Sequence, residues 1–197
     1  MAWLNEEYAD EFAVLTTWLA ALLPWSISWG SDPATQSLLV FFRLPIVDFQ
    51  LRFPTEVTVD GQVIETTIPQ RLAEQYGGID LVANAHVVFP PSRLGAVDGT
   101  HSWAYLAWSV ATVVFLIAFV LSLAMYWRED AVQARLPVEY ATLTAGLFGV
   151  LAVLLGVATI GLFQAGGAYG TPIPIGVVLL GAFAVLLWRA ERVPSTG

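Results

Sequence analysis

The chain has 197 residues, of which 57% are hydrophobic and only 12% are charged, with a mean hydropathy of +0.69. Soluble domains carry about 25% charged residues, so this composition indicates a bilayer environment. Sixteen carboxylates oppose eight basic residues, all of them arginine, and the net charge of −8 argues against nucleic acid or anionic headgroups as partners. The absence of cysteine excludes disulfides, thiol catalysis and thiolate metal sites.

Residues 1–11 predict a short helix on the membrane surface, because Trp3, Leu4 and Tyr8 share one helical face and acidic residues lie mostly opposite. Their acidic character argues against a secretory signal, so we expect a permanent first span at residues 12–29. These eighteen uncharged residues are at the short end of the spanning range. Pro24 removes a main-chain donor within them, which predicts a kink that is either a hinge or a packing bend.

Residues 30–102 predict a small α+β module of about 70 residues outside the bilayer. Residues 47–53 alternate strictly between apolar and polar side chains, which is typical of a half-buried strand. Asp60-Gly61 favours a tight hairpin turn between short strands. A core of this size without disulfides is expected to need support from the helices, a partner or a second copy. The predicted elements are strands at 38–42, 47–53, 57–59, 62–64 and 81–89, and a helix at 69–76.

The uncharged stretch from Tyr105 to Trp127 is the clearest span, because its 23 residues cover roughly 34 Å as a helix, against a hydrocarbon core of about 30 Å. The sequence therefore predicts an α-helical membrane protein with four transmembrane helices and the α+β module between the first two. Arginines beside the ends of spans are enriched on the cytoplasmic side of a membrane. The arginines in 128–139 and 189–197 therefore predict that both termini lie in the cytoplasm and that residues 30–102 lie outside the plasma membrane. The later segments are a span at 103–127, a cytoplasmic loop at 128–139, a span at 140–163, an outer turn at 164–171, a span at 172–188 and a cytoplasmic tail at 189–197.

No ionisable residue lies inside these predicted spans, which argues against proton pumps, ion pathways and voltage sensors. We find no catalytic or cofactor-binding motif, so the chain is predicted to be non-enzymatic and to carry no cofactor. His86 and His101 are weak metal-ligand candidates together with Asp80 or Asp98, and ordinary hydrogen-bonded histidines are the simpler interpretation.

Two features suggest contacts with other chains. Ala141, Ala145 and Gly149 recur every four residues, and small residues at this spacing let helices approach closely. This stripe fits packing inside the bundle or, alternatively, a face for a second copy or another membrane subunit. Gln50 and Arg52 lie on the polar face of a predicted strand, where an exposed edge would accept a partner's strand; an ordinary solvated face is the alternative.

The opening EEYADEFAVLTTWLAALLPWSISW and the segment VFFRLP at 40–45 resemble a group of small uncharacterised haloarchaeal integral membrane proteins. The resemblance covers about the first quarter of the chain and implies an archaeal plasma membrane, but no activity. It agrees with the acidic, lysine-free composition, which suits high salt. The layout is also similar to that of claudin-like four-span proteins, without their outer cysteine pair.

The predicted function is an accessory or assembly subunit that acts through its outer module and its helix faces, with the bilayer and another membrane protein or a second copy as partners. One alternative is a sensor whose outer module binds a ligand and whose spans move about Pro24. The other alternative is a transporter or channel subunit.

Overall fold

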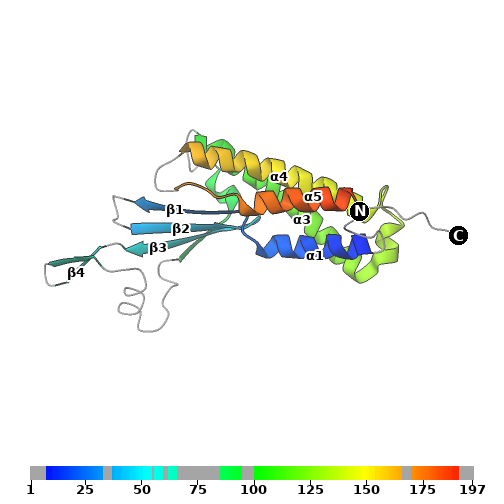
Figure 1. Cartoon of the computed structure of the whole chain (residues 1–197), viewed down its shortest axis with the longest axis horizontal. Coiled ribbons are helices and arrows are strands. Elements are labelled where there is room, and N and C mark those ends of the chain that lie inside the picture. The colour runs from blue at the N-terminus through cyan, green and yellow to red at the C-terminus, as the bar shows by residue number, and fades with distance from the viewer. Residues whose placement is uncertain are drawn as a thin grey trace.

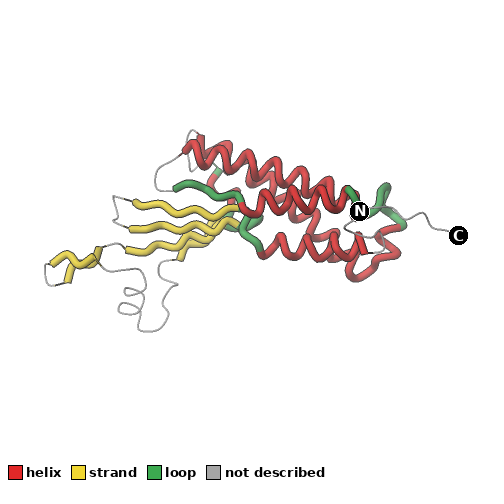
Figure 2. The backbone as a smooth tube through the Cα atoms, viewed as in Figure 1, coloured by secondary structure: helices red, strands yellow, loops and turns green. Residues whose placement is uncertain are grey.

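The computed structural model describes residues 8–32, 37–54, 56–59, 62–65, 85–94, 100–165 and 170–190. The helices among these residues form an elongated bundle, and the strands project from one end of it (Figures 1 and 2). The helices are α1 (Ala9–Leu22), α3 (Thr100–Gln133), α4 (Tyr140–Ala165) and α5 (Ile175–Trp188). The strands are β1 (Ser26–Asp32), β2 (Ser37–Arg43), β3 (Asp48–Pro54), β4 (Glu56–Val59), β5 (Gln62–Glu65) and β6 (Ala85–Val88), and a short 3₁₀ helix, η3 (Pro90–Arg93), follows β6.

The helices differ in length. Among the described residues, α3 and α4 are the two helices that are long and apolar enough to cross a membrane, although the core helix of a soluble protein passes the same test. α1 and α5 have 14 residues each, which corresponds to about 21 Å. α3 runs antiparallel beside α4, and the two short helices pack side by side near the end where α4 begins (Figure 1).

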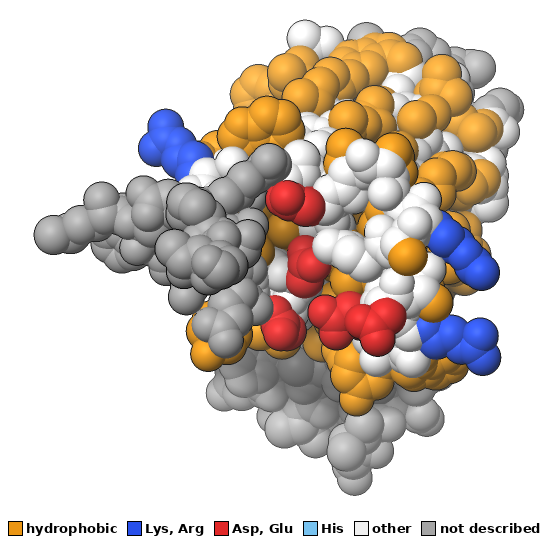
Figure 3. Space-filling model, turned by 90° about the vertical axis from the view of Figure 1, so that its right-hand side faces the viewer, with side chains coloured by type: hydrophobic (Ala, Val, Ile, Leu, Met, Phe, Trp, Pro, Cys, Tyr) orange, Lys and Arg blue, Asp and Glu red, His pale blue; other side chains and the backbone are white. Residues whose placement is uncertain are grey.

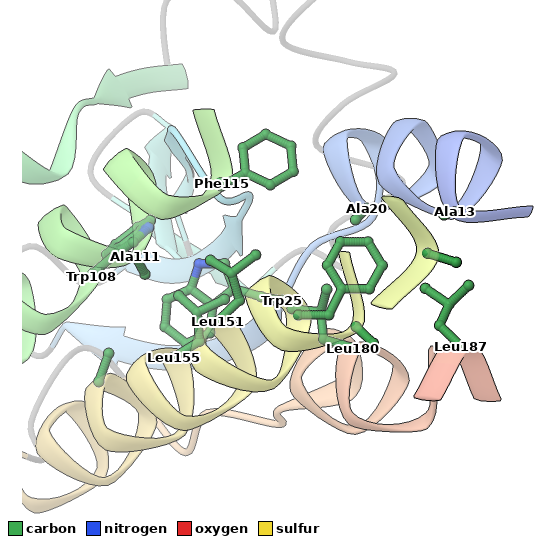
Figure 4. Packing of buried hydrophobic residues seen from close by; sticks show 14 of the residues in the cluster. Ala13, Ala20, Trp25, Trp108, Ala111, Phe115, Leu151, Leu155, Leu180 and Leu187 are labelled. Carbon is green, nitrogen blue, oxygen red and sulfur yellow. The ribbon is translucent and has the colours of Figure 1, made fainter. Parts of the chain in front are cut away.

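The core runs along α4, whose Phe148, Leu151 and Leu155 are fully buried. Figure 4 shows Leu151 and Leu155 beside Trp25. Where the helices meet the sheet, the rings of Trp25 and Trp108 pack edge to face with their centroids 5.1 Å apart. Each large apolar side chain buried in this way stabilises the fold by about 1.5–3 kcal/mol relative to an exposed one.

The main sheet has the order β1-β2-β3-β6, and all of its neighbouring strands are antiparallel. Arg43 at the end of β2 lies directly opposite Ser26 of β1 and Asp48 of β3. β4 and β5 form a separate two-stranded hairpin, in which Val59 lies opposite Gln62, as the sequence predicts. The strands of the main sheet begin beside the ends of α1 and α5 and extend away from the bundle (Figure 1).

The prediction of one helix over 12–29 is wrong beyond Leu22. α1 ends there, Leu23 is extended, and β1 begins at Ser26. Pro24 ends the helix instead of kinking it, because its ring lacks a donor and clashes with the preceding turn. The following amide, that of Trp25, donates to the main-chain oxygen of Arg43 (2.8 Å), so the chain passes directly into the sheet. Pro24 is therefore not a hinge within a helix.

Two other boundaries also differ from the prediction. The helix that begins at Thr100 continues to Gln133 across a non-helical Arg128 (φ −147°, ψ 54°), so the loop predicted at 128–139 is shorter. The last helix begins at Ile175 and not at residue 172, because Ile173 is extended and pairs with β1. The predicted surface helix at 1–11 falls mostly outside the described residues, and the predicted helix at 69–76 lies wholly outside them.

Candidate functional site at the sheet–helix junction

The two faces of the main sheet differ sharply in chemistry. On the face we call the polar face, Ser26, Ser28, Arg43 and Asp48 are all fully buried. The opposite, apolar face is open: Trp29 is 56% exposed, Phe49 39% and Val87 54%. By strand register, the part of the polar face nearest the helices includes Ser26, Ser28, Phe41, Arg43, Asp48 and Gln50, and Leu39 and Arg52 continue this face farther out. The apolar face includes Ile27, Trp29, Val40, Phe42, Phe49, Leu51 and Val87.

A buried arginine and a buried aspartate form the centre of the polar face. The Nη1 group of Arg43 donates to Ser28 Oγ (2.8 Å), and its guanidinium lies 4.9 Å from the centre of the Phe41 ring. Asp48 lies opposite Arg43 in the sheet, and its Oδ2 accepts a hydrogen bond from Gln50 Nε2 (2.9 Å). Three adjacent strands thus bring an opposite-charge pair and its hydrogen-bond partners into one buried layer.

Opposing effects act on the charge of Asp48. Burial disfavours an ionised carboxylate, whereas the positive charges of Arg43 and Arg93 and the hydrogen bond from Gln50 favour it, with Arg43 the largest of these. Arg43 and Asp48 therefore act as a single electrostatic unit.

The turn between β2 and β3 attaches this unit to α3. The main-chain oxygen of Pro45 accepts hydrogen bonds from Trp108 Nε1 (3.1 Å) and from Thr112 Oγ1 (2.8 Å). Within the turn, the amide of Leu44 donates to the oxygen of Val47 (2.8 Å). The turn is therefore fixed at a defined height along α3.

The opposite end of the bundle carries a groove of about 310 Å³ between α1 and α3. The rings of Trp18 and Tyr126 line it with their centroids 5.1 Å apart, and Trp18 Nε1 donates to Ser122 Oγ (3.1 Å). Figure 3 views this end and shows acidic side chains gathered in the middle, with apolar side chains on the flanks. The residues that line the groove are Asp10, Glu11, Val14, Leu15, Trp18, Met125, Tyr126 and Glu129.

Asp10 has a structural role at this end, since its Oδ1 accepts from the main-chain amide of Ala141 (2.9 Å) and its Oδ2 from Gln133 Nε2 (3.1 Å). It therefore caps the start of α4 from a different helix. Burial raises the pKa of Asp10, the hydrogen bond from Ala141 opposes the rise, and the charges of Glu11 and Glu139 add to it.

The residues predicted to contact other chains are placed differently from one another. Ala141 and Ala145 are only 6% and 3% exposed, so they pack inside the chain's own bundle and offer no face to a partner. Gly149 is half-buried, and a Cβ added there would meet nothing within 4 Å. Gln50 is paired on both sides, with Phe41 and with His86, so the predicted open edge is wrong at this position. Arg52 is exposed.

The two histidines have described main chains, His86 in β6 and His101 in α3, but their side chains lie outside the described part of the structure, as do Asp80 and Asp98. Among the described residues, no group of three or more histidine, aspartate or glutamate side chains is placed to hold a metal ion.

The buried pair of Arg43 and Asp48 was not among the predicted site residues. The signal for it is the sequence RLPIVD, in which two opposite charges flank four apolar residues. A turn of that length returns the chain antiparallel, so the flanking charges become neighbours on one face of the sheet.

A family model described as "Family of unknown function (DUF7549)" matches residues 2–192. The match therefore includes all of the helices and strands described above. No curated protein matches the chain.

Proposed function

This chain belongs to that family of unknown function, and on this premise we propose that it is a non-enzymatic, multi-pass membrane protein that acts as an accessory or assembly subunit. The observation that carries the proposal is the outward exposure of large apolar side chains along the helices. Lipid acyl chains are the environment in which such a surface is stable.

The exposure extends over the two long helices and over the short helix α5. In the apolar windows of α3 and α4, only 28% and 33% of the residues are buried, whereas the core helix of a soluble protein is mostly buried. Val120 on α3 and Val153 on α4 are 61% and 67% exposed, and Val178 on α5 is 67% exposed. Soluble monomers rarely expose contiguous apolar patches larger than a few hundred Å². The distribution of side chains therefore favours four helices in a bilayer.

We propose the same topology that the arginines predict. The start of α1 is hydrogen-bonded to the end of α3 and the start of α4, so these ends lie together. Arg128, Arg135 and Arg189 lie beside helix ends on this side, which favours the cytoplasm, and the sheet then faces the exterior of a haloarchaeal plasma membrane.

An assembly role is favoured over transport or sensing. Buried hydroxyl groups in the bundle, such as those of Thr17 and Ser109, donate to main-chain oxygens four residues earlier in their own helices, which supports tight packing and not a hydrated path. The sensor alternative loses its hinge, because Pro24 ends α1. The β4–β5 hairpin projects farthest from the helices (Figure 1), and this position suits contact with a partner outside the membrane.

The cysteine-free chain permits a clean test of membrane topology. We expect Arg52→Cys, on the exposed part of β3, to react with a membrane-impermeant maleimide on intact cells. Arg135→Cys, at the opposite end, should react only after lysis. Labelling of Arg135→Cys alone on intact cells would invert the topology, and full release of the chain from membranes by alkaline carbonate would reject a membrane protein altogether.

Assembly is tested by extraction into lipid nanodiscs and measurement of the particle's protein mass. We expect particles with more protein than the 21.4 kDa of one chain, and crosslinking from a photoreactive residue placed at Thr58 of β4. Particles that contain one chain and yield no crosslink in cells would reject the accessory-subunit role.

A further inference from the structure

We propose that the base of the main sheet lies within the outer half of the bilayer, with its apolar face against lipid acyl chains. The sheet base comprises residues 26–29, 40–51 and 85–88. This inference rests on the membrane proposal above and adds a non-helical element at hydrocarbon depth. The sequence-based prediction places the whole of residues 30–102 outside the membrane instead.

Helix length is the first argument. α1 covers about 21 Å with its 14 residues, and a hydrocarbon core is about 30 Å thick. Asp10 in the first turn of α1 bonds to the first turn of α4, so both helices start at the same level. α1 therefore ends about 9 Å short of the far side. The equally short α5 begins near the same level, because the amide of Gly176 in its first turn donates to the oxygen of Trp25, just beyond α1. Figure 1 shows the strands beginning in this space, beside α3 and α4.

The position of the β2–β3 turn along α3 gives its depth. The oxygen of Pro45 bonds to Thr112, which lies 15 residues (127 − 112) before the aromatic end of the span at Trp127. Fifteen helical residues correspond to about 22 Å, a height still inside a core of about 30 Å. The other aromatic end, at Trp103, is nine residues (112 − 103) away, or about 13 Å. The two heights leave about 8 to 13 Å of apolar depth beyond the turn, and at about 3.3 Å per residue this holds about two to four residues of each strand.

Side-chain chemistry agrees with this depth. The turn residues Leu44, Pro45, Ile46 and Val47 are all apolar, and Ile46 is 38% exposed, whereas turns in water favour glycine, asparagine, aspartate and serine. Above the turn, the charged pair points inward and the apolar face points outward. A sheet with one face in water has the opposite arrangement, with polar side chains on the open face.

The main chain of the sheet base also meets the requirement of a lipid environment, where backbone groups must be paired within the protein. On the β1 side, Ile27 and Ile173 exchange two hydrogen bonds (3.1 and 2.8 Å), and the amide of Gly176 donates to the oxygen of Trp25 (3.1 Å). On the other side, β6 covers residues 48–51 of β3 and is itself the last strand of the sheet. The main chain is therefore paired beside Trp25 and Ile27 and along the start of β3, where open groups would be costly in lipid.

The test uses nitroxide labels on single cysteines in the full chain, reconstituted in bilayers. Collision with oxygen, which concentrates in lipid, is compared with collision with a water-soluble nickel chelate. We expect labels at Phe49→Cys and Val87→Cys to favour oxygen as strongly as one at Val153→Cys on α4. A label at Arg52→Cys, farther along β3, should favour the nickel chelate.

The outcomes separate the two proposals. A lipid-like result at Val153 with nickel-accessible labels at Phe49 and Val87 would overturn this inference and leave the membrane protein intact. A nickel-accessible label at Val153 would instead reject the membrane proposal itself. Low collision rates with both reagents at Phe49 and Val87 would show that protein covers the face, and would overturn contact with lipid. Two sheet positions are used so that one misfolded variant, detected by circular dichroism, does not decide the result.

Discussion

Replacement of Asp48 by asparagine should destabilise the protein strongly through the buried cation that it leaves behind. Asparagine keeps the shape of the side chain and an oxygen that can accept the hydrogen bond from Gln50, but removes the negative charge opposite Arg43. Arg43 has no exposed surface through which to regain hydration. The change therefore isolates the electrostatic part of the interaction.

Breaking a buried ion pair by removing one partner typically costs about 3–5 kcal/mol. We expect the lower end, about 3 kcal/mol, because Arg43 retains its hydrogen bond to Ser28 and its position over the Phe41 ring. Replacement of both members, in Arg43→Met/Asp48→Leu, should recover most of this loss, since apolar residues of similar volume often replace a buried pair at little cost.

The assay is unfolding in detergent micelles by titration with sodium dodecyl sulfate, followed by far-ultraviolet circular dichroism. Arg52→Met is the matched control, because it removes an exposed arginine from β3, the strand that also carries Asp48. This change should alter the free energy of unfolding by less than about 0.5 kcal/mol. The two residues do not form an electrostatic unit if Asp48→Asn changes the free energy of unfolding by less than about 1 kcal/mol. The same conclusion follows if Arg43→Met/Asp48→Leu is destabilised by as much as the sum of Arg43→Met and Asp48→Leu measured separately.

Three further predictions use the same unfolding assay. Gly176→Ala should destabilise by about 1–3 kcal/mol, because its Cβ would clash with the main chain of Trp25. Gly149→Ala, whose Cβ would meet nothing within 4 Å, should be neutral or stabilising, and equal effects of the two changes would contradict this packing. Burial raises the pKa of Asp10 above its ordinary value of 3.8, so this carboxyl group binds its proton more tightly in the folded state than in the unfolded state. The free energy of unfolding should therefore fall as the pH rises from 3.8 through the folded pKa, and Asp10→Asn should remove that part of the pH dependence. Thr112→Val should cost about 1 kcal/mol by removing a donor to the β2–β3 turn, and no loss would mean that the turn is held otherwise.

Much of the architecture is predictable from local pattern. Strict alternation locates β3, and Asp60-Gly61 between two short apolar runs locates the β4–β5 hairpin. Hydropathy locates the two long helices, because their apolar runs are long enough to span a membrane. β1 escaped prediction, since SISW continues an uncharged run and hydropathy does not distinguish a strand from the end of a helix.

The polarity of the sheet was less predictable. Alternation shows that Asp48, Gln50 and Arg52 share a face, but not whether water or protein lies on that side. The usual expectation of a wet polar face therefore placed Gln50 at a solvated edge, whereas its strand is paired on both sides. Which face is open depends on the height at which the turn meets α3, and that contact joins residues 67 positions apart in sequence.

The buried pair and the apolar outer face also constrain each other through strand register. A slip of β3 by one residue would turn Asp48 outward and bring Phe49 inward, and the same slip of β2 would expose Arg43, because neighbouring residues in a strand face opposite sides. If the outer face lies against lipid, each exposed charge would cost about 2.5–3.5 kcal/mol, or about 5–7 kcal/mol for the pair. In water the same slip would hydrate both charges and cost far less. The charges therefore specify the strand register most strongly in a membrane. Replacing both residues by apolar ones would change the stability of the correctly paired sheet little, but it would remove the penalty that disfavours the slipped arrangement.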